Sequence, residues 1–408
     1  MEAAEFETRR GKMAVTDISM LRERRKKKKA ERFIRNLVII LAVAAAIMAI
    51  VFTKNLWYPK LDGILTKIPA PENTAELAEG YFPLSIEGGA SYQLLAVDNC
   101  LALADDSHFF VHNADGKIIS SAQHTYSNPV ITAGSKKILL YDLGGKSFAL
   151  YSKYKNVYSK NTDEPILIAR LGSGDTAAVV TKSDKYPSVL MVYDGTGKNI
   201  FNYRSVSRII DVTFNSDSSG CYITSIGVSG GFIVSRIIYY RFDKIDYNEM
   251  GDPVPVWETE NIETLALSVR LFGDNNIILI GDRMCAYYDM DGNLMDSYEY
   301  KRQLADYSSD GNVAAMIFTN EERRSSELVT IDCTTGEMTE KPLDYESLNV
   351  QVSGNTVYIQ SRNGIESFTA AGEQLSFVKL DTDYDSFCRM GSYIYLLGYD
   401  EINRINYN

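Results

Sequence analysis

The chain has 408 residues, enough for two or three ordinary domains or one large repeat domain. Hydrophobic residues make up 45% and charged residues 23%, which excludes a wholly disordered chain. Residues 1–36 carry 12 basic and 6 acidic side chains, whereas residues 55–408 carry 29 basic and 47 acidic ones, a net charge of −18. So acidic a bulk argues against binding of a nucleic-acid backbone by the main part of the chain.

A basic cluster followed by an apolar stretch dominates the N-terminal part. No charged residue lies between Arg35 and Lys54, an interval of 18 residues rich in Leu, Ile, Val and Ala. At about 1.5 Å per residue, a helix over residues 36–53 spans roughly 27 Å, close to the hydrocarbon core of about 30 Å. The sequence therefore predicts a transmembrane helix at residues 36–53, after a basic tail at residues 1–35.

The same segment predicts topology, because positively charged flanks stay in the cytoplasm. We expect a single-pass cell-membrane protein with its N-terminus in the cytoplasm and its C-terminal domain outside the cell. The residues expected to anchor the chain and set its topology are Arg22, Arg24, Arg25, Lys26, Lys27, Lys28, Lys29, Arg32, Arg35, Lys54, Trp57 and Tyr58. Trp57 and Tyr58 form an interfacial aromatic pair.

Other interpretations of this segment fit less well. A cleaved signal peptide has a short charged region, but here some 36 residues precede the apolar stretch and no small-x-small site follows it before Trp57. A buried core helix rarely carries so dense a basic flank. The lysine run could contact nucleic acid, but its place beside a span favours contact with anionic lipid.

Residues 54–80 are expected to form a stalk, which Pro59, Pro69 and Pro71 punctuate. From residue 81 onward, short β-branched and aromatic runs alternate with turns of Gly, Asp, Asn and Ser. No long segment has the helical period of 3.6 residues. The pattern predicts an all-β domain over residues 81–408.

Similar turns recur along this domain, and their glycines Gly116, Gly195, Gly292, Gly336 and Gly372 are 79, 97, 44 and 36 residues apart. The first two spacings are about twice a unit of roughly 40–50 residues. A unit of that length with four short strands is typical of a β-propeller blade. Units are expected to begin near Ser91, Val130, Ile166, Arg208, Thr264, Gln303, Ser347 and Tyr384.

This count favours eight blades, with seven as the alternative if the long fourth unit is divided differently. The last unit has room for only three strands before Asn408. Tyr81–Ile86 is the candidate for the missing outer strand, beside Glu401–Ile405. Such pairing would close the ring and remove an open sheet edge.

Two segments, Val329–Glu337 (VTIDCTTGE) and Val192–Lys198 (VYDGTGK), resemble strand–turn segments of pyrroloquinoline-quinone-like and WD40-like propeller repeats. The tryptophans that dock the quinone in such enzymes are missing, because the only tryptophans are Trp57 and Trp257. A basic tail, a single span and a Tyr-rich propeller together resemble the bacterial envelope proteins grouped as domain of unknown function 5711. That resemblance implies a Gram-positive-type cell surface and supplies no activity.

The histidines His108, His112 and His124 all fall in the first expected blade. On a regular strand, His108 and His112 lie about 13 Å apart, whereas two ligands of one zinc ion must each lie within about 2.1 Å of it. Asp381, Asp383 and Asp385 alternate as in a calcium loop, but the required Gly and Glu positions hold Ser386 and Ser392. An Asp-Gly hairpin turn accounts for Asp289, Asp291 and Gly292. No metal site is predicted.

The cysteines are also expected to be structural. They lie mostly in apolar strands of different blades, which favours buried thiols over a disulfide framework: Cys100, Cys221, Cys285, Cys333 and Cys388. The glycine-rich run at residues 227–231 has the wrong spacing for a phosphate loop and is interpreted as a hairpin connection. No catalytic residue and no cofactor is predicted.

The sequence favours a membrane-tethered, non-catalytic module that binds or scaffolds a cell-envelope protein or polymer outside the cell. One alternative is a transmembrane sensor that couples an external ligand to a cytoplasmic partner. Another is a hydrolase or lyase for envelope carbohydrate, with paired carboxylates in the central funnel. The expected partners are the membrane, with anionic lipid near the basic tail, and the envelope protein or polymer, but no nucleic acid.

Overall fold

The computed structural model describes residues 73–74, 80–273, 276–320 and 325–407. The chain divides into two units, Met1–Pro69 and Ala70–Asn408. The basic tail, the expected transmembrane helix and all the anchoring residues from Arg22 to Tyr58 lie outside the described residues and stay predictions. Within the described ranges, no helix has the length and apolar character needed to cross a membrane.

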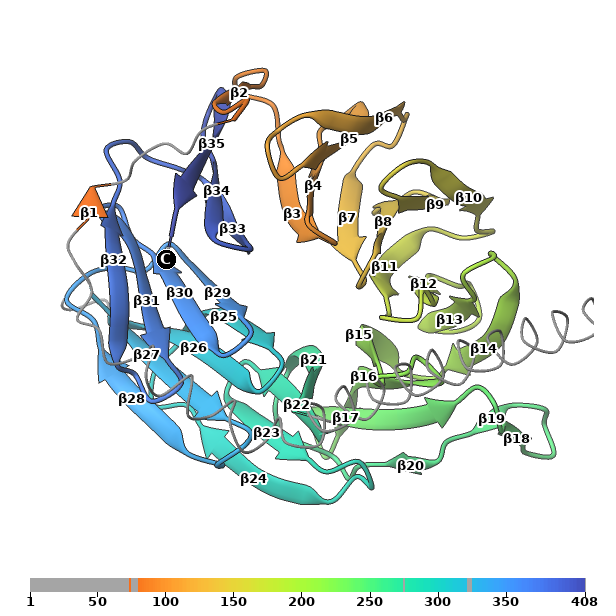
Figure 1. Ribbon diagram of the computed structural model, residues 1–408. Helices are drawn as coiled ribbons and strands as arrows, with labels where there is room; N and C mark the ends of the chain where they lie inside the picture. The colour runs from red at the N-terminus through yellow and green to blue at the C-terminus, as the bar shows by residue number, and fades with distance from the viewer. Residues whose placement is uncertain (1–72, 75–79, 274–275, 321–324, 408) are drawn as a thin grey trace, which may run out of the picture. The chain divides into compact units, whose positions relative to one another are not determined.

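The described part of the second unit is an all-β propeller with eight blades, viewed roughly along its axis in Figure 1. Each blade is a four-stranded antiparallel sheet in which the first strand is innermost. Blade 1 contains β3 (Gln93–Val97), β4 (Cys100–Ala104), β5 (His108–Asn113) and β6 (Ile118–Gln123). Blade 2 contains β7 (Pro129–Ala133), β8 (Lys137–Asp142), β9 (Ser147–Ser152) and β10 (Asn156–Asn161). Blade 3 contains β11 (Ile166–Leu171), β12 (Ala177–Thr181), β13 (Ser188–Tyr193) and β14 (Asn199–Ser205).

Blades 4 to 7 continue the same order. Blade 4 contains β15 (Arg208–Phe214), β16 (Gly220–Ser229), β17 (Phe232–Arg241) and the short β20 (Trp257–Glu258). Blade 5 contains β21 (Ala266–Phe272), β22 (Asn276–Gly281), β23 (Met284–Tyr288) and β24 (Leu294–Glu299). Blade 6 contains β25 (Leu304–Asp310), β26 (Val313–Asn320), β27 (Ser325–Asp332) and β28 (Met338–Pro342). Blade 7 contains β29 (Asn349–Ser353), β30 (Thr356–Gln360), β31 (Gly364–Thr369) and β32 (Gln374–Lys379).

Blade 8 takes its strands from both ends of the domain, namely β33 (Ser386–Met390), β34 (Tyr393–Leu397), β35 (Glu401–Asn406) and β2 (Leu84–Ser85). Leu84 lies opposite Ile402, and Ser85 lies opposite Glu401. The structure thus confirms that Tyr81–Ile86 supplies the outer strand, although only two of its residues pair regularly. It also confirms eight blades and not seven. The innermost strands of these blades begin within two residues of the expected starts.

Arg404 fastens the junction between blades 8 and 1. Its side chain is 2% exposed, and Nη1 donates to the Ala114 carbonyl and, at 3.0 Å, to the Asp115 carboxylate. The guanidinium also lies 4.3 Å from the ring centre of Tyr393. A charge so buried is tolerated because its hydrogen bonds and an aromatic face replace water.

The core is divided among the junctions between blades. Eight clusters of buried side chains fill the eight junctions, each cluster drawing on two neighbouring blades. The cluster between blades 3 and 4, for example, contains Leu190, Val192, Val212 and Ile223. Alternating β-branched and aromatic residues suit this arrangement because both faces of every blade are covered.

Side chains also link the innermost strands of neighbouring blades. Gln93 Oε1 accepts from the backbone N–H of Ile131, Asp306 Oδ2 from that of Val350, and Gln351 Oε1 from that of Arg389, at 2.8–3.1 Å. The inner edge of an innermost strand has no strand partner, so these bonds satisfy backbone donors that would otherwise lack one.

Two short additions modify the regular blades. Blade 4 carries a hairpin of β18 (Asp246–Tyr247) and β19 (Pro253–Val254) between its third and fourth strands. The strand β1 (Asn73–Thr74) lies parallel to β32, the outer strand of blade 7 (Figure 1). The outer edge of that blade therefore accepts a fifth strand.

Candidate functional site

Blade 4 differs from its neighbours in the length of its central hairpin. β16 and β17 each have ten residues and pair over their whole length, from Gly220 opposite Arg241 to Ser229 opposite Phe232. The turn consists of Gly230 and Gly231, with φ of 59° and 89°. Positive φ at both positions is typical of the tightest hairpin turns, and glycine adopts it without steric cost. The structure confirms that the glycine-rich run is a hairpin connection.

The end of this hairpin projects into solvent. A Cβ atom added to Gly230 or Gly231 would meet nothing within 4 Å. Three apolar side chains beside the turn are exposed: Val228 by 76%, Phe232 by 64% and Ile233 by 55%. Val228 and Ile233 lie directly opposite each other on the two strands.

A fourth apolar residue belongs to the same surface. Val206 is 81% exposed and lies in the linker that leads into β15. The adjacent Ser207 lies beside the hairpin, because a Cβ atom added to Gly227 would lie 3.7 Å from Ser207 Oγ. We call Val206, Val228, Phe232 and Ile233 the hairpin tip patch. Grouped exposed apolar side chains are typical of protein interaction surfaces.

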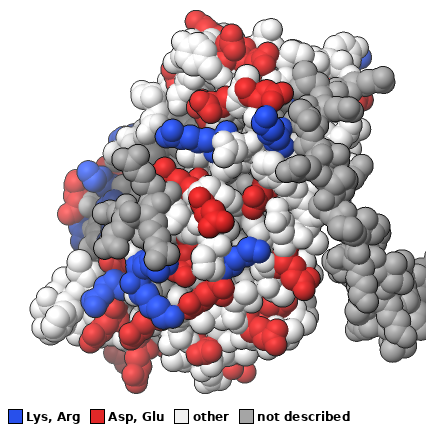
Figure 2. Space-filling model, turned by 90° about the vertical axis from the view of Figure 1, so that its left-hand side faces the viewer, with Lys and Arg blue, Asp and Glu red and all other residues white. Residues whose placement is uncertain are grey.

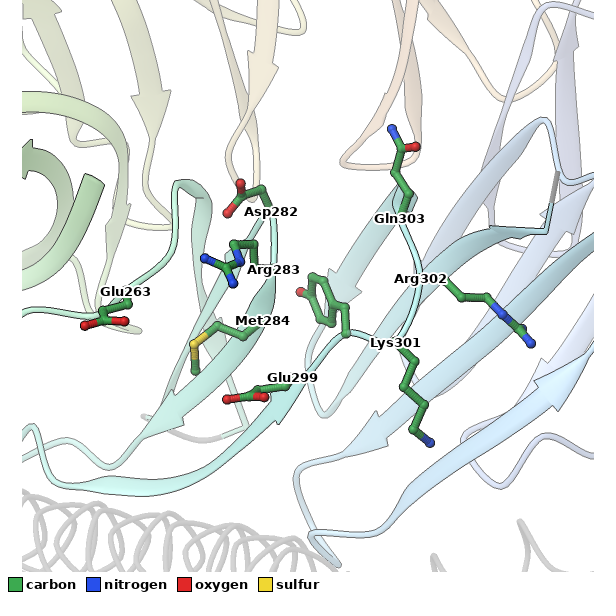
Figure 3. Close-up of a pocket in the computed structure, with 9 residues that line it drawn as sticks. Glu263, Asp282, Arg283, Met284, Glu299, Lys301, Arg302 and Gln303 are labelled. Carbon is green, nitrogen blue, oxygen red and sulfur yellow. The ribbon is translucent and has the colours of Figure 1, made fainter. Parts of the chain in front are cut away.

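A cavity of about 500 Å³ lies on the same face, over blades 5 and 6 (Figure 3). In an antiparallel four-stranded blade, the turn between the second and third strands and the linkers between blades lie at one end of the strands. The cavity uses the β22–β23 turn of blade 5 and the linkers before and after this blade. It is lined by Glu263, Asp282, Arg283, Met284, Glu299, Tyr300, Lys301, Arg302 and Gln303.

Two of the cations that line this cavity already have ion-pair partners. Lys301 Nζ lies 2.9 Å from Glu340 Oε1, and Arg302 Nη1 lies 2.6 Å from Glu327 Oε2. The hydrogen bond from Lys301 lowers the pKa of the Glu340 carboxyl. Figure 3 shows Lys301 and Arg302 pointing away from Arg283. Arg283 has no ion-pair partner among the described residues, so its guanidinium can meet a ligand or partner.

The surface charge is mixed where it can be seen. Figure 2 shows acidic side chains spread over the side of the propeller that bears β28 and β32, with basic side chains in smaller groups among them. Such a surface attracts basic groups on a partner. Salt weakens this electrostatic attraction by screening.

The three histidines take part in two separate sets of aromatic contacts. His108 and His112 lie on β5 on either side of Phe110, with ring-centre distances of 5.7 and 6.1 Å to it. Burial lowers the pKa of His112, which is 7% exposed. His124 packs on Tyr126 instead. Among the described residues, no group of three or more His, Cys, Asp or Glu side chains could hold a metal ion.

The acidic candidates lie in turns and linkers. Asp289 accepts from the backbone N–H groups of Asp291 and Asn293 at 2.9 and 2.8 Å, and the hydrogen bond from the Asn293 side chain lowers its pKa. These bonds confirm the Asp-Gly turn. Asp381, Asp383 and Asp385 are exposed in the linker between β32 and β33.

Four cysteines are buried thiols, as expected: Cys100, Cys221, Cys285 and Cys388. Burial raises the pKa of Cys285 and of Cys388 to about 12, and it raises the pKa of Cys100 and Cys221 as well. Cys333 is half-buried, and its Sγ lies 3.3 Å from the Phe272 carbonyl oxygen. Because the thiolate is the reactive form, the buried cysteines are poor nucleophiles near neutral pH.

Sequence reasoning missed the hairpin tip patch. The local signal is present, since Val228–Ile233 (VSGGFI) places apolar residues on both sides of a Gly-Gly turn. Nothing in the local sequence shows that this hairpin extends past the rest of the blade, because that depends on where the neighbouring linkers end.

Comparisons with known proteins agree with this architecture. DUF5711, described as a family of unknown function, matches residues 83–406. No curated protein matches the chain in sequence.

Among solved structures, Sqt1 from Saccharomyces cerevisiae is similar with a TM-score of 0.58 and 10% identity, over 83% of this chain and all of that one. BamB from Moraxella catarrhalis is similar with a TM-score of 0.53 and 14% identity, over 82% of this chain and 98% of that one. The WD40 domain of Neurospora crassa Pan2 aligns over 69% of this chain and 89% of its own, with 10% identity and a TM-score of 0.45. At such low identity, the likeness to Sqt1 and BamB concerns the fold alone.

Proposed function

The chain belongs to the DUF5711 family, whose function is unknown, and we propose that it is a membrane-tethered extracytoplasmic propeller that binds or scaffolds a cell-envelope protein or polymer. The partner docks on the face that carries the β16–β17 hairpin. The propeller serves as a rigid platform, and the loops on its faces provide recognition.

The hairpin tip patch is the observation that carries this proposal. Phe232 and Ile233 remain exposed by 64% and 55% on a strand that is otherwise largely covered. An exposed aromatic or branched side chain on a rigid hairpin loses little conformational entropy on binding. Such residues commonly serve as anchors at the centre of protein interfaces.

Membrane tethering by residues 36–53 completes the proposal. It is supported by the uncharged stretch between Arg35 and Lys54 and by the basic cluster on one flank only. No catalytic step is part of the proposed function.

Affinity capture with the tagged full-length chain, expressed in cells that naturally contain it, tests the binding surface. The double variant Phe232→Ser, Ile233→Ser should lose at least about 2 kcal/mol of binding free energy, the scale of an interface anchor. The matched control is Met250→Ser, because Met250 is 87% exposed in the β18–β19 hairpin of the same blade. Capture of the same partner with equal efficiency by all three proteins would refute docking at the tip.

Labelling of intact cells tests the topology. A cysteine added after Asn408 should react with a membrane-impermeant maleimide, because the C-terminal domain is proposed to lie outside. The matched control is a cysteine added before Met1, which should react only after the membrane is broken. Protection of the C-terminal cysteine in intact cells would reject the external placement. Turnover of an envelope carbohydrate by the purified chain would reject the non-catalytic function.

A further inference from the structure

A second candidate site lies inside the ring, away from the hairpin tip patch. A cavity of about 300 Å³ is lined by Thr132, Ala133, Arg170, Leu171, Val212, Thr213, Phe214 and Arg270. These residues belong to β7, β11, β15 and β21, the innermost strands of blades 2 to 5. The cavity therefore faces the axis of the propeller, around which these four strands are arranged in Figure 1.

A buried carboxylate next to this cavity holds its two arginines in place. Asp211 on β15 has a side chain that is 1% exposed, and it joins the innermost strands of three consecutive blades. Its Oδ1 accepts from Arg170 Nε and from the backbone N–H of Val212, at 2.8 and 2.9 Å. Its Oδ2 accepts from Ser268 Oγ and from the backbone N–H of Val269, at 3.0 and 3.2 Å. Arg270 Nη1 also donates to Oδ2.

The two arginines carry more positive charge than is needed to neutralise the Asp211 carboxylate. One guanidinium is enough to neutralise Asp211, so the second leaves one positive charge in excess at this place. Among the described residues that line the cavity, only Arg170 and Arg270 carry charge. A partly enclosed charge without a counter-ion is costly, because solvation is incomplete there.

Arg170 already donates through Nε to Asp211 and through Nη1 to the Ala169 carbonyl. Arg270 is therefore the arginine with more donor nitrogens left for a ligand. The arginine side chains are 29% and 33% exposed, and both groups line the cavity. Arg270 donates through Nη1 to Asp211 and to the Val269 carbonyl, and its Nε and Nη2 have no partner among the described residues. Because Asp211 holds both side chains, their remaining N–H groups are oriented before any ligand arrives.

The remaining walls suit a small polar group with an apolar body. Thr132 and Thr213 add two hydroxyl groups from β7 and β15, while Leu171, Val212 and Phe214 supply apolar surface. The volume is at the lower end of the range for ligand pockets. It is enough for a small organic anion but not for a polymer.

We propose that Arg170 and Arg270 form a binding site inside the ring for an oxyanion, carried by a small ligand as its carboxylate or phosphate group. The fork of N–H donors on a guanidinium matches two oxygens of either group. Asp211 acts as a positioning residue that holds the two arginines 100 residues apart in sequence at one place in space.

Isothermal titration calorimetry tests this site with the full-length chain in a neutral detergent at low salt. Inorganic phosphate and succinate are the two probes, and sodium chloride at equal ionic strength is the blank. At least one probe should bind with a Kd of about 1 mM or tighter. Binding of phosphate alone or of succinate alone would identify the group that the site prefers.

Two variants and one control decide the assignment. Arg270→Gln should weaken binding at least tenfold, which corresponds to the loss of one charge-assisted contact. Arg270→Lys keeps the charge without the fork and should show an intermediate affinity. Arg283→Gln removes an equal charge from the cavity over blades 5 and 6 and should change nothing. Thermal unfolding verifies that each variant is folded.

Two results would overturn the proposal. One is the failure of both probes to bind the folded wild-type chain at up to about 10 mM, where even weak recognition of a charge by two arginines would register. The other is an affinity of Arg270→Gln within twofold of wild type. Neither result bears on docking at the hairpin tip patch, which has its own variants.

Discussion

Blades 4 and 6 place an aspartate at the same point of their innermost strands, but in different electrostatic surroundings. Asp211 and Asp306 each follow a register shift in the pairing of the first two strands. Each also accepts from the backbone of the next innermost strand, at Val269 N and Val350 N. Each aspartate thus joins its own blade to the next one through a hydrogen bond.

The difference lies on the neighbouring innermost strands. Blades 3 and 5 have Arg170 and Arg270 two residues after the shift, and both guanidiniums reach Asp211. Beside Asp306, the residue that follows the donor Val350 is the uncharged Gln351. Its Oε1 accepts from the Arg389 backbone N–H at 3.0 Å. Within the described part of the chain, Asp306 accepts only from backbone N–H groups, and burial raises its pKa despite them. Joining the blades therefore requires no arginine.

Removal of the charge at blade 4 should have the largest effect on stability. Asp211→Asn leaves two partly buried guanidiniums without their anion, and we expect a loss of about 3 kcal/mol in the free energy of unfolding. Urea denaturation of the purified chain measures it. A loss below about 1 kcal/mol would show that the arginines relax into solvent without cost.

The same change at blade 6 should matter less. In Asp306→Asn the amide oxygen can still accept one backbone N–H, while the burial cost of a charge disappears, so we expect a change of about 1 kcal/mol or less. The measurement is again the urea midpoint at neutral pH, beside Asp211→Asn. Equal losses in the two variants would contradict the distinction between the blades.

Replacement of one arginine by lysine should have a smaller effect still. Arg270 reaches Asp211 through a single nitrogen, so the ammonium group of Arg270→Lys can keep the charge near the carboxylate. We expect a loss of about 0.5 kcal/mol in the free energy of unfolding. The shift in thermal midpoint relative to Arg270→Gln checks it. A larger loss for the lysine variant than for the glutamine variant would mean that shape, not charge, dominates.

The smallest expected effect is a difference between the wild-type chain and Asp306→Asn in how the free energy of unfolding depends on pH. A carboxyl with a pKa raised above its ordinary value of 3.8 binds its proton more readily in the folded state. The wild-type chain should therefore gain stability relative to Asp306→Asn as the pH falls from neutrality toward that ordinary value. Urea midpoints of both proteins along a pH series test the sign. A relative loss of stability in acid would show that the folded state favours the charged form.

The sequence predicted the ring better than the interior of the ring. Glycine turns and strand lengths are local signals, so the eight units and the pairing of residues 81–86 with the last strand followed from the chain alone. The network at Asp211 joins residues 41 and 59 positions away. A one-residue shift in β11, β15, β21 and β25 decides which side chain of these strands faces the axis, and no local sequence pattern predicts that shift.

The closure of blade 8 also sets the order of events during synthesis. β2 emerges from the ribosome more than 300 residues before β35, the strand with which it pairs. At about 5–20 residues per second, roughly 15 to 60 s pass before the partner exists. During that interval Phe82 and Leu94 lack Tyr395 and Ile402, which complete their buried cluster. A nascent chain arrested before Glu401 would thus present an open ring with an uncovered apolar edge, a substrate for quality-control proteases.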